Sequence, residues 1–105
     1  PAGDVSTLVF DEIDAGVGGQ VARRVGERLR SLGGDRQVVC ITHLAQVAAL
    51  GSTHFRVRKR SDGDTTTATV DAVSGAEQHA EIVRMLGAEE GDEAAGRHAR
   101  ELLAA

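Results

Sequence analysis

Apolar residues in the first half of the chain form two short continuous runs, separated by a stripe of helical spacing. The runs at Thr7–Asp11 and 37–42 predict strands that are apolar on both faces and central in a sheet. A helix from Gly19 to Leu32 is predicted between them. The members of its buried stripe would be Val21, Val25, Leu29 and Leu32. The order strand, helix, strand predicts a right-handed βαβ unit with parallel strands.

The middle of the chain shows alternation instead. After a short helix over about residues 44–50, positions 54–60 place Phe55 and Val57 on one face and arginines on the other. The turn residues at 61–64 are followed by a β-branched run at 65–73. Together these segments predict an antiparallel hairpin.

Two helices follow the hairpin. The spacing of Ser74 and Glu77 predicts a capping box at the start of a helix that continues to about Leu86. Its buried residues would be Ile82, Met85 and Leu86. A last helix is predicted over about residues 92–103. The fold class is therefore α/β: a parallel βαβ unit, then an antiparallel hairpin and C-terminal helices.

Composition and charge narrow the function classes. With 16 acidic and 12 basic residues and a net charge of −4, the chain is not a general nucleic-acid coat. The one cysteine, Cys40, excludes an internal disulfide framework, fits a reducing cytosol and lies where a core residue is expected. No apolar run is long enough to span a membrane, so we expect a cytoplasmic chain without a membrane partner. A strand begins almost at the N-terminus with no initiator Met, which suggests a piece of a larger protein.

A pair of carboxylates, Asp11 and Glu12, follows the first strand. Ligands of open α/β sheets bind at the carboxyl ends of the strands. There, one carboxylate can hold Mg²⁺ through water, and the other can orient or deprotonate an attacking water. The alternative is that the pair only caps the loop or the next helix, whose start favours negative charge.

Three glycines, Gly16, Gly18 and Gly19, come next and do not match a phosphate loop. The only lysine, Lys59, lies in the alternating strand with no glycine before it, so the chain has no Walker A motif. The dinucleotide pattern also fails, because Val21 occupies its third glycine position. The glycines therefore provide a tight turn or a close approach for another backbone or ligand.

His43 directly follows the second strand. If the two strands are neighbours, His43 lies near Asp11 and Glu12 at one edge of the sheet. A histidine there can donate a hydrogen bond to a phosphate oxygen. Taken alone, His43 could equally be a solvent-facing residue at a helix start.

These motifs together resemble the head of an ABC-type, SMC-like ATPase. The stretch TLVFDE resembles a Walker B motif, and ITH at 41–43 resembles the switch-histidine loop. The stretches DEIDAGVGG and ITHLAQVAA, and the tail EIVRMLG…HARELL, are closer to the RecN family of bacterial DNA repair proteins. The resemblance covers nearly the whole chain. It implies that residues 1–105 form the C-terminal lobe of a P-loop ATPase head that acts in recombinational repair of double-strand breaks, in the cytoplasm at the nucleoid.

The resemblance also implies roles, with ATP and Mg²⁺ as cofactors. Asp11 would coordinate Mg²⁺ through water, Glu12 would polarise the hydrolytic water, and His43 would contact the γ-phosphate. Residues 13–19 would form a D-loop that packs against the Walker A motif of a second subunit in an ATP-dependent head dimer. The cofactor-binding positions would be Asp11, Gly16, Gly18 and Gly19. The other partners implied are the remainder of the same head, which holds the Walker A motif and the signature loop, and DNA through the full-length protein.

Two positions depart from the family pattern. Ala45 stands where we expect proline, a change that should be tolerated because the position only starts a helix. Gly18 stands where many ABC proteins place the D-loop aspartate, so no role of that aspartate carries over.

Other readings remain open. The chain could be the equivalent segment of another SMC-like or ABC ATPase, or a non-catalytic α/β interaction module. The basic run at 56–60 could contact DNA or be the solvated side of a hairpin. His54, His79 and His98 have no metal-ligand spacing with one another or with Cys40. Without a Walker A motif the chain alone should be inactive, and its unpaired strand edges should lead it to self-associate.

Overall fold

The computed structural model describes residues 6–11 and 18–104. The elements, in chain order, are β1 (Thr7–Asp11), α1 (Gly19–Leu32), β2 (Gln37–Ile41), α2 (Ala45–Ala48), β3 (His54–Asp62), β4 (Thr65–Val73), α3 (Gly75–Met85) and α4 (Glu93–Ala104). This order confirms the predicted α/β fold class, with a parallel pair of strands before a hairpin and two helices.

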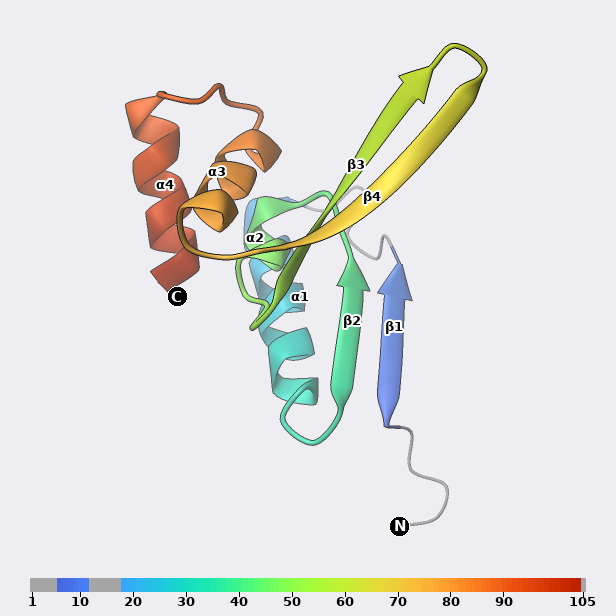
Figure 1. The fold of residues 1–105 in the computed structure, drawn as a ribbon. Helices are drawn as coiled ribbons and strands as arrows, with labels where there is room; N and C mark the ends of the chain where they lie inside the picture. Colours follow the sequence, from blue (N-terminus) through green and yellow to red (C-terminus); the bar gives the residue numbers. More distant parts are fainter. Residues whose placement is uncertain (1–5, 12–17, 105) are drawn as a thin grey trace.

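The first two strands lie side by side and run in the same direction (Figure 1). Their register pairs Thr7 with Gln37 at one end and Asp11 with Ile41 at the other. The backbone N–H of Gln37 also donates to the carbonyl oxygen of Ser6 at 2.8 Å, which extends the pairing beyond β1. The predicted βαβ unit with parallel strands is therefore confirmed.

Only one face of this two-stranded sheet is covered within the described residues. Phe10, Val38 and Cys40 pack against the core under α1. On the opposite face, Val9 is 64% exposed and Ile41 is 51% exposed. The strands are apolar on both faces, as predicted, but only one face is covered by described residues, and the predicted central position is wrong here because the sheet has two strands. The side chains alternate between the faces, and no described element packs on the second face.

Helix α1 packs through a narrower stripe than predicted. Ala22 and Leu29 are buried and Val25 is half-buried, but Val21 and Leu32 are exposed. The small residues Ala22 and Gly26 decide which face of α1 is buried, because α2 approaches α1 over Gly26. A helix turned so that its small side faces a neighbour carries the flanking apolar side chains away from the contact.

The short helix α2 joins two hydrophobic cores. On one side Val47 packs with Ala22 and Leu29 of α1. On the other side Ala45 and Ala49 pack with residues of the C-terminal helices. The C-terminal members of that second core are Ile82, Val83, Ala99 and Leu102. In Figure 1, α2 accordingly lies between the β1–β2–α1 layer and the α3–α4 pair.

Strands β3 and β4 form the predicted antiparallel hairpin, paired from His54 with Val73 to Asp62 with Thr65. The two-residue turn contains Gly63 at φ +62°, a left-handed conformation that glycine adopts without strain. The predicted alternation is present, since Phe55 is 59% exposed and Val57 57% exposed, whereas the Arg56 side chain is only 15% exposed.

The two C-terminal helices start differently. Ser74 lies at the start of α3, but its side chain makes no capping hydrogen bond, so the predicted capping box is wrong. Gly75 has φ +57°, which places the first residue of α3 outside right-handed helical geometry and misaligns the Ser74 hydroxyl. In α4 the cap does form, because Asp92 Oδ1 accepts a hydrogen bond from the Ala95 N–H at 3.0 Å.

The hairpin projects well beyond the packed layers (Figure 1). The radius of gyration is 15.1 Å, against about 13 Å for a compact domain of 100 residues. Across the described residues, no helix combines the length and apolar character that crossing a membrane requires.

Candidate functional site

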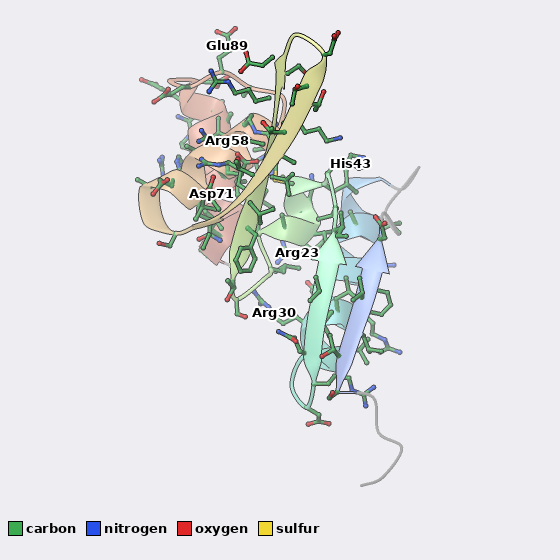
Figure 2. All side chains as sticks on the ribbon, turned by 45° about the vertical axis from the view of Figure 1, so that its right-hand side comes forward. Arg23, Arg30, His43, Arg58, Asp71 and Glu89 are labelled. Carbon is green, nitrogen blue, oxygen red and sulfur yellow. The ribbon has the colours of Figure 1, made fainter. Side chains whose placement is uncertain are left out.

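The carboxyl ends of β1 and β2 bring two of the predicted site residues to one edge of the sheet. Asp11 is the last residue of β1 and pairs with Ile41, the last residue of β2. His43 follows two residues later and lies beyond the end of β2 (Figure 2). Asp11 and His43 are both exposed, so this edge is open to a ligand or to another protein segment.

The loop that carries His43 is anchored on both sides of it. The Leu44 N–H donates to Thr42 Oγ1 at 3.0 Å, which closes a short turn around His43. The Leu44 side chain packs into the core under α1. The backbone carbonyl oxygen of Leu44 accepts a hydrogen bond from the Ala48 N–H at 3.0 Å. The fold therefore fixes the backbone around an exposed imidazole, as a ligand-contacting histidine requires.

The glycine segment is described only in part. Glu12 and Gly16 lie outside the described residues. Gly18 is exposed in an extended conformation, and its carbonyl oxygen accepts from the Ala22 N–H at 2.9 Å. A Cβ placed on Gly18 would meet nothing within 4 Å, so no described part of this chain approaches it closely. Gly19 begins α1.

The start of α1 offers little support for the capping alternative. Gly18 is its N-cap residue, no side chain among residues 6–11 and 18–104 caps it, and its first turn contains no acidic residue. Asp11 ends a strand instead, paired with Ile41. Ligands of open α/β sheets bind at the carboxyl ends of the strands, which is where Asp11 lies.

The described residues do not form a complete metal site. No group of three or more histidine, cysteine, aspartate or glutamate side chains among them could hold a metal ion. Asp11 can supply one carboxylate oxygen. Mg²⁺ is commonly held by one or two carboxylates together with water and substrate phosphates, and a single strand-end aspartate fits that donor set.

A second polar region lies between β3 and the C-terminal helices. Arg56 Nη2 lies 3.9 Å from Asp71 Oδ2 and 3.9 Å from Glu77 Oε2. Within α3, Arg84 donates to the carboxylate of the buried Glu81 through both Nε and Nη2, with Nε at 3.1 Å from Oε1 and 3.0 Å from Oε2. Of these contacts, the one between Arg56 and Glu77 joins the hairpin base to α3.

These contacts shift two titrating groups. The hydrogen bonds from Arg84 lower the pKa of the Glu81 carboxyl. Burial lowers the pKa of His54, the nearby Glu81 opposes that effect and Arg56 adds to it. His54 Nδ1 and Arg56 Nε are buried without a hydrogen-bond partner among the described residues.

The basic run of β3 is visible in the sequence, but the basic residues of α4 that line the same cleft were not predicted. Arg97 and Arg100 lie three residues apart on α4 and line the same cleft as Arg58. Their helical spacing was a visible signal. Their proximity to β3 depends on how α4 packs in the fold, and the spacing alone does not reveal that packing.

Comparison with known proteins gives one consistent relationship, although no family model matches. DNA repair protein RecN of Treponema pallidum is 45% identical over 102 residues, which cover 97% of this chain and 18% of that protein. RecN of Streptomyces coelicolor is 46% identical over 99 residues, which cover 94% of the chain and 17% of that protein. RecN of Bacillus subtilis is 43% identical over 100 residues, 95% of the chain and 17% of that protein.

The fold has a counterpart among solved structures. A structure from work on ATP-driven dimerization and DNA-stimulated activation of SMC ATPases matches with a TM-score of 0.67 at 20% identity. The match covers 85% of this chain and 52% of that one. The chain thus has an SMC ATPase-type fold and is homologous, over nearly its whole length, to a segment that makes up about 18% of the RecN DNA repair proteins.

Proposed function

We propose that this chain supplies part of the ATP site in the head of a RecN-type ATPase that acts in recombinational repair of DNA double-strand breaks. The observation that carries the proposal is the parallel pairing of β1 and β2, which brings Asp11 and His43 to one sheet edge. The high identity to RecN proteins of several bacteria supports it. Such a protein would work in the cytoplasm at the nucleoid.

The two described site residues suit two different contacts with the phosphates of a nucleotide. Asp11 would hold Mg²⁺ through water, and the bound ion would neutralise charge on the phosphates. His43 would donate a hydrogen bond to a terminal phosphate oxygen, because its neutral ring still carries one N–H. The anchored turn around His43 would keep that donor in place.

Glu12 follows Asp11 directly and would orient and deprotonate the attacking water. Successive residues of an extended chain point in different directions, so two adjacent carboxylates can serve a cation and a water. Residues 13–19 would form a D-loop, in which Gly18 leaves room for the backbone of a second subunit. The space around Gly18 in this chain is compatible with such an approach.

The remaining parts of the site would come from elsewhere. The only lysine, Lys59, is an exposed residue of β3 and cannot serve as a phosphate-loop lysine at the Asp11 edge. We therefore assign residues 1–105 to one lobe of the head. Its partners would be the remainder of the same head, a second subunit, and DNA through the longer protein.

The test is reconstitution of the head from two pieces. The chain is mixed with the segment that carries the Walker A motif, and ATP turnover is measured for each piece and for the mixture. The proposal expects turnover only in the mixture. Turnover by this chain alone, or none in a mixture that binds ATP, would overturn it.

A substitution then separates catalysis from binding. Glu12→Gln should abolish turnover in the mixture while ATP still binds, because the base is lost but the phosphate contacts remain. Glu101→Gln, an exposed position on α4, is the matched control and should turn over normally. If Glu12→Gln keeps normal turnover, the chain is a non-catalytic module instead.

A further inference from the structure

The connection between β2 and α2 consists of three residues, Thr42, His43 and Leu44. Thr42 and Leu44 are half-buried, whereas His43 between them is exposed beyond the end of β2 (Figure 2). An exposed side chain on so short a connection takes its position from the two residues beside it. Whatever holds Thr42 and Leu44 therefore sets where the imidazole of His43 can reach.

Leu44 is held from its C-terminal side. Its side chain packs into the core under α1. Its backbone carbonyl oxygen accepts hydrogen bonds from the N–H groups of Val47 at 3.1 Å and Ala48 at 3.0 Å, which form the first turn of α2. Leu44 is thus a fixed point from which the connection leads back to β2.

Helix α2 depends on tertiary contacts to keep that point in place. It has four residues, and a single isolated turn of helix is unstable in water. Ala45 and Val47 are buried, and Arg30 Nε of α1 donates to the Leu50 carbonyl oxygen at 3.1 Å. These contacts attach the body and the far end of α2 to the rest of the fold, while its near end continues into the connection.

Thr42 closes the connection from the side of β2. Its Oγ1 accepts a hydrogen bond from the Leu44 N–H at 3.0 Å, across His43. Threonine suits this place because its branched side chain has few rotamers and its hydroxyl can bond the backbone two residues further along the chain. The acceptor belongs to a side chain, so a substitution can remove this hydrogen bond and leave the backbone sequence of the connection unchanged.

A hydrogen bond of this kind can also serve stability alone. Asp92 provides the comparison, because its Oδ1 accepts from the Ala95 N–H at 3.0 Å at the start of α4. The residues that this second bond spans, 93–94, have no predicted role. The bond at Thr42 instead spans a histidine that lies at the same sheet edge as Asp11.

We propose that Thr42 is a positioning residue for His43. Its hydroxyl accepts the Leu44 N–H and thereby holds the imidazole where it meets the terminal phosphate. Thr42 acts through His43 and does not itself contact the nucleotide. This inference rests on the proposed function and adds a residue to which the sequence pattern gave no role. Positioning matters for the rate because a small misplacement of a reacting or contacting group lowers turnover strongly.

The experiment measures kcat and KM for ATP in the head reconstituted from this chain and the segment that carries the Walker A motif. Thr42→Val keeps the shape of the side chain and removes the hydroxyl. It should lower kcat about fivefold, a change in rate typical for the loss of one hydrogen bond, and leave KM within about twofold. Thr42→Ser keeps the hydroxyl, so its kcat should stay within about twofold of the unmodified value.

The matched control removes a side chain to backbone hydrogen bond elsewhere. Asp92→Ala removes the acceptor for the Ala95 N–H and should leave kcat within about twofold, because α4 carries none of the predicted ATP-site residues. Circular dichroism of each variant shows whether it is folded.

A double-mutant cycle separates positioning from the other roles that the Thr42 hydroxyl could have. In His43→Ala no imidazole is left to position, so adding Thr42→Val should change kcat by less than about twofold. A purely structural role, or a direct contact of the hydroxyl with the nucleotide, would lower kcat about equally in both backgrounds.

A second measurement needs no turnover. Amide hydrogen exchange in the same mixture without ATP is followed at the Leu44 N–H. Its exchange should be about fivefold faster in Thr42→Val and within about twofold of the unmodified rate in Thr42→Ser. The amides of α4 should exchange at the same rate in all three proteins.

Several results would overturn the proposal. They are an unchanged kcat or an unchanged Leu44 exchange in Thr42→Val, equal losses of kcat in Thr42→Ser or Asp92→Ala, and a further fivefold loss when Thr42→Val is added to His43→Ala. A loss in His43→Ala without a loss in Thr42→Val would leave the proposed function standing and exclude only the positioning role. Normal turnover in His43→Ala would instead overturn the role of His43 in the proposed function.

Discussion

Gly26 and Leu50 approach so closely that a side chain at Gly26 would displace the end of the Leu50 side chain. A Cβ built on Gly26 would lie 2.6 Å from Leu50 Cδ1 and 3.4 Å from the Val47 Cα. One helical turn later, Arg30 Nε donates to the Leu50 carbonyl oxygen at 3.1 Å. These two contacts attach α2, and the His43 loop that precedes it, to α1.

Gly26→Val should therefore destabilise the chain by about 2–3 kcal/mol, because its branched side chain would displace the buried Leu50 and press on the backbone of α2. Urea unfolding followed by circular dichroism measures the loss. Ser31→Val, at an exposed position of the same helix, is the control and should stay within about 0.5 kcal/mol. Equal losses in the two variants would show that the close approach does not limit stability.

The local pattern of the sequence was sufficient to place the elements. The bounds of β1 and α1 agree with the prediction because their signals are local: an apolar run ending in carboxylates, and helical spacing between glycines. The position of Asp11 and His43 after two neighbouring parallel strands also predicted that both lie at the same edge of the sheet. The parallel register supports that geometry, while the roles of both residues remain predictions.

The failures have a common physical cause. Val21 was expected in the core of α1, but the contact face is set by Gly26, whose importance depends on a partner that is distant in sequence. The capping box failed because Gly75 adopts a positive φ that a spacing rule does not include. Arg97 and Arg100 were missed for the same reason, since they line one cleft with Arg58 only after tertiary packing.

Ala45→Pro should be tolerated. Ala45 is the first residue of α2, and Leu44 before it is extended at φ −94° and ψ 122°, a conformation compatible with a following proline. We expect a change in unfolding free energy of less than about 1 kcal/mol in either direction. Thermal unfolding by circular dichroism measures the change.

The matched control is Ala48→Pro, which should cost about 3 kcal/mol because the Ala48 N–H donates to the Leu44 carbonyl oxygen. Similar losses in the two variants would contradict the assignment of Ala45 to the helix start.

The isolated chain should self-associate through the open face and edges of the β1–β2 sheet. Val9, Val39 and Ile41 expose apolar surface there, and unpaired strand edges accept further strands. Light scattering at increasing concentration should show mass above that of a monomer. Val9→Lys should shift the chain toward monomer, whereas Thr67→Lys on the exposed hairpin should not. A monomer at all concentrations would exclude this prediction.

Acidification should destabilise the contact between the hairpin and α3, beginning with His54. Burial lowers the pKa of His54 in the folded chain, so below its ordinary value of about 6.5 the unfolded chain binds more protons than the folded chain. Stability should therefore be complete above about pH 6.5 and fall as the pH decreases toward the lowered pKa. The groups that face His54 are Glu81 on α3, which opposes the shift, and Arg56 on its own strand, which adds to it.

Urea midpoints are measured from pH 7.5 to about pH 3.5; between pH 6.5 and pH 5 they should decrease for the unmodified chain and change less for His54→Gln. His98→Gln, at an exposed position of α4, should leave the pH dependence unchanged. Below about pH 4.3 a further loss is expected in both variants, because the hydrogen bonds from Arg84 lower the pKa of Glu81 and protonation removes them. If His54→Gln retains the full decrease between pH 6.5 and pH 5, another group is responsible and the half-buried imidazole does not set the pH dependence.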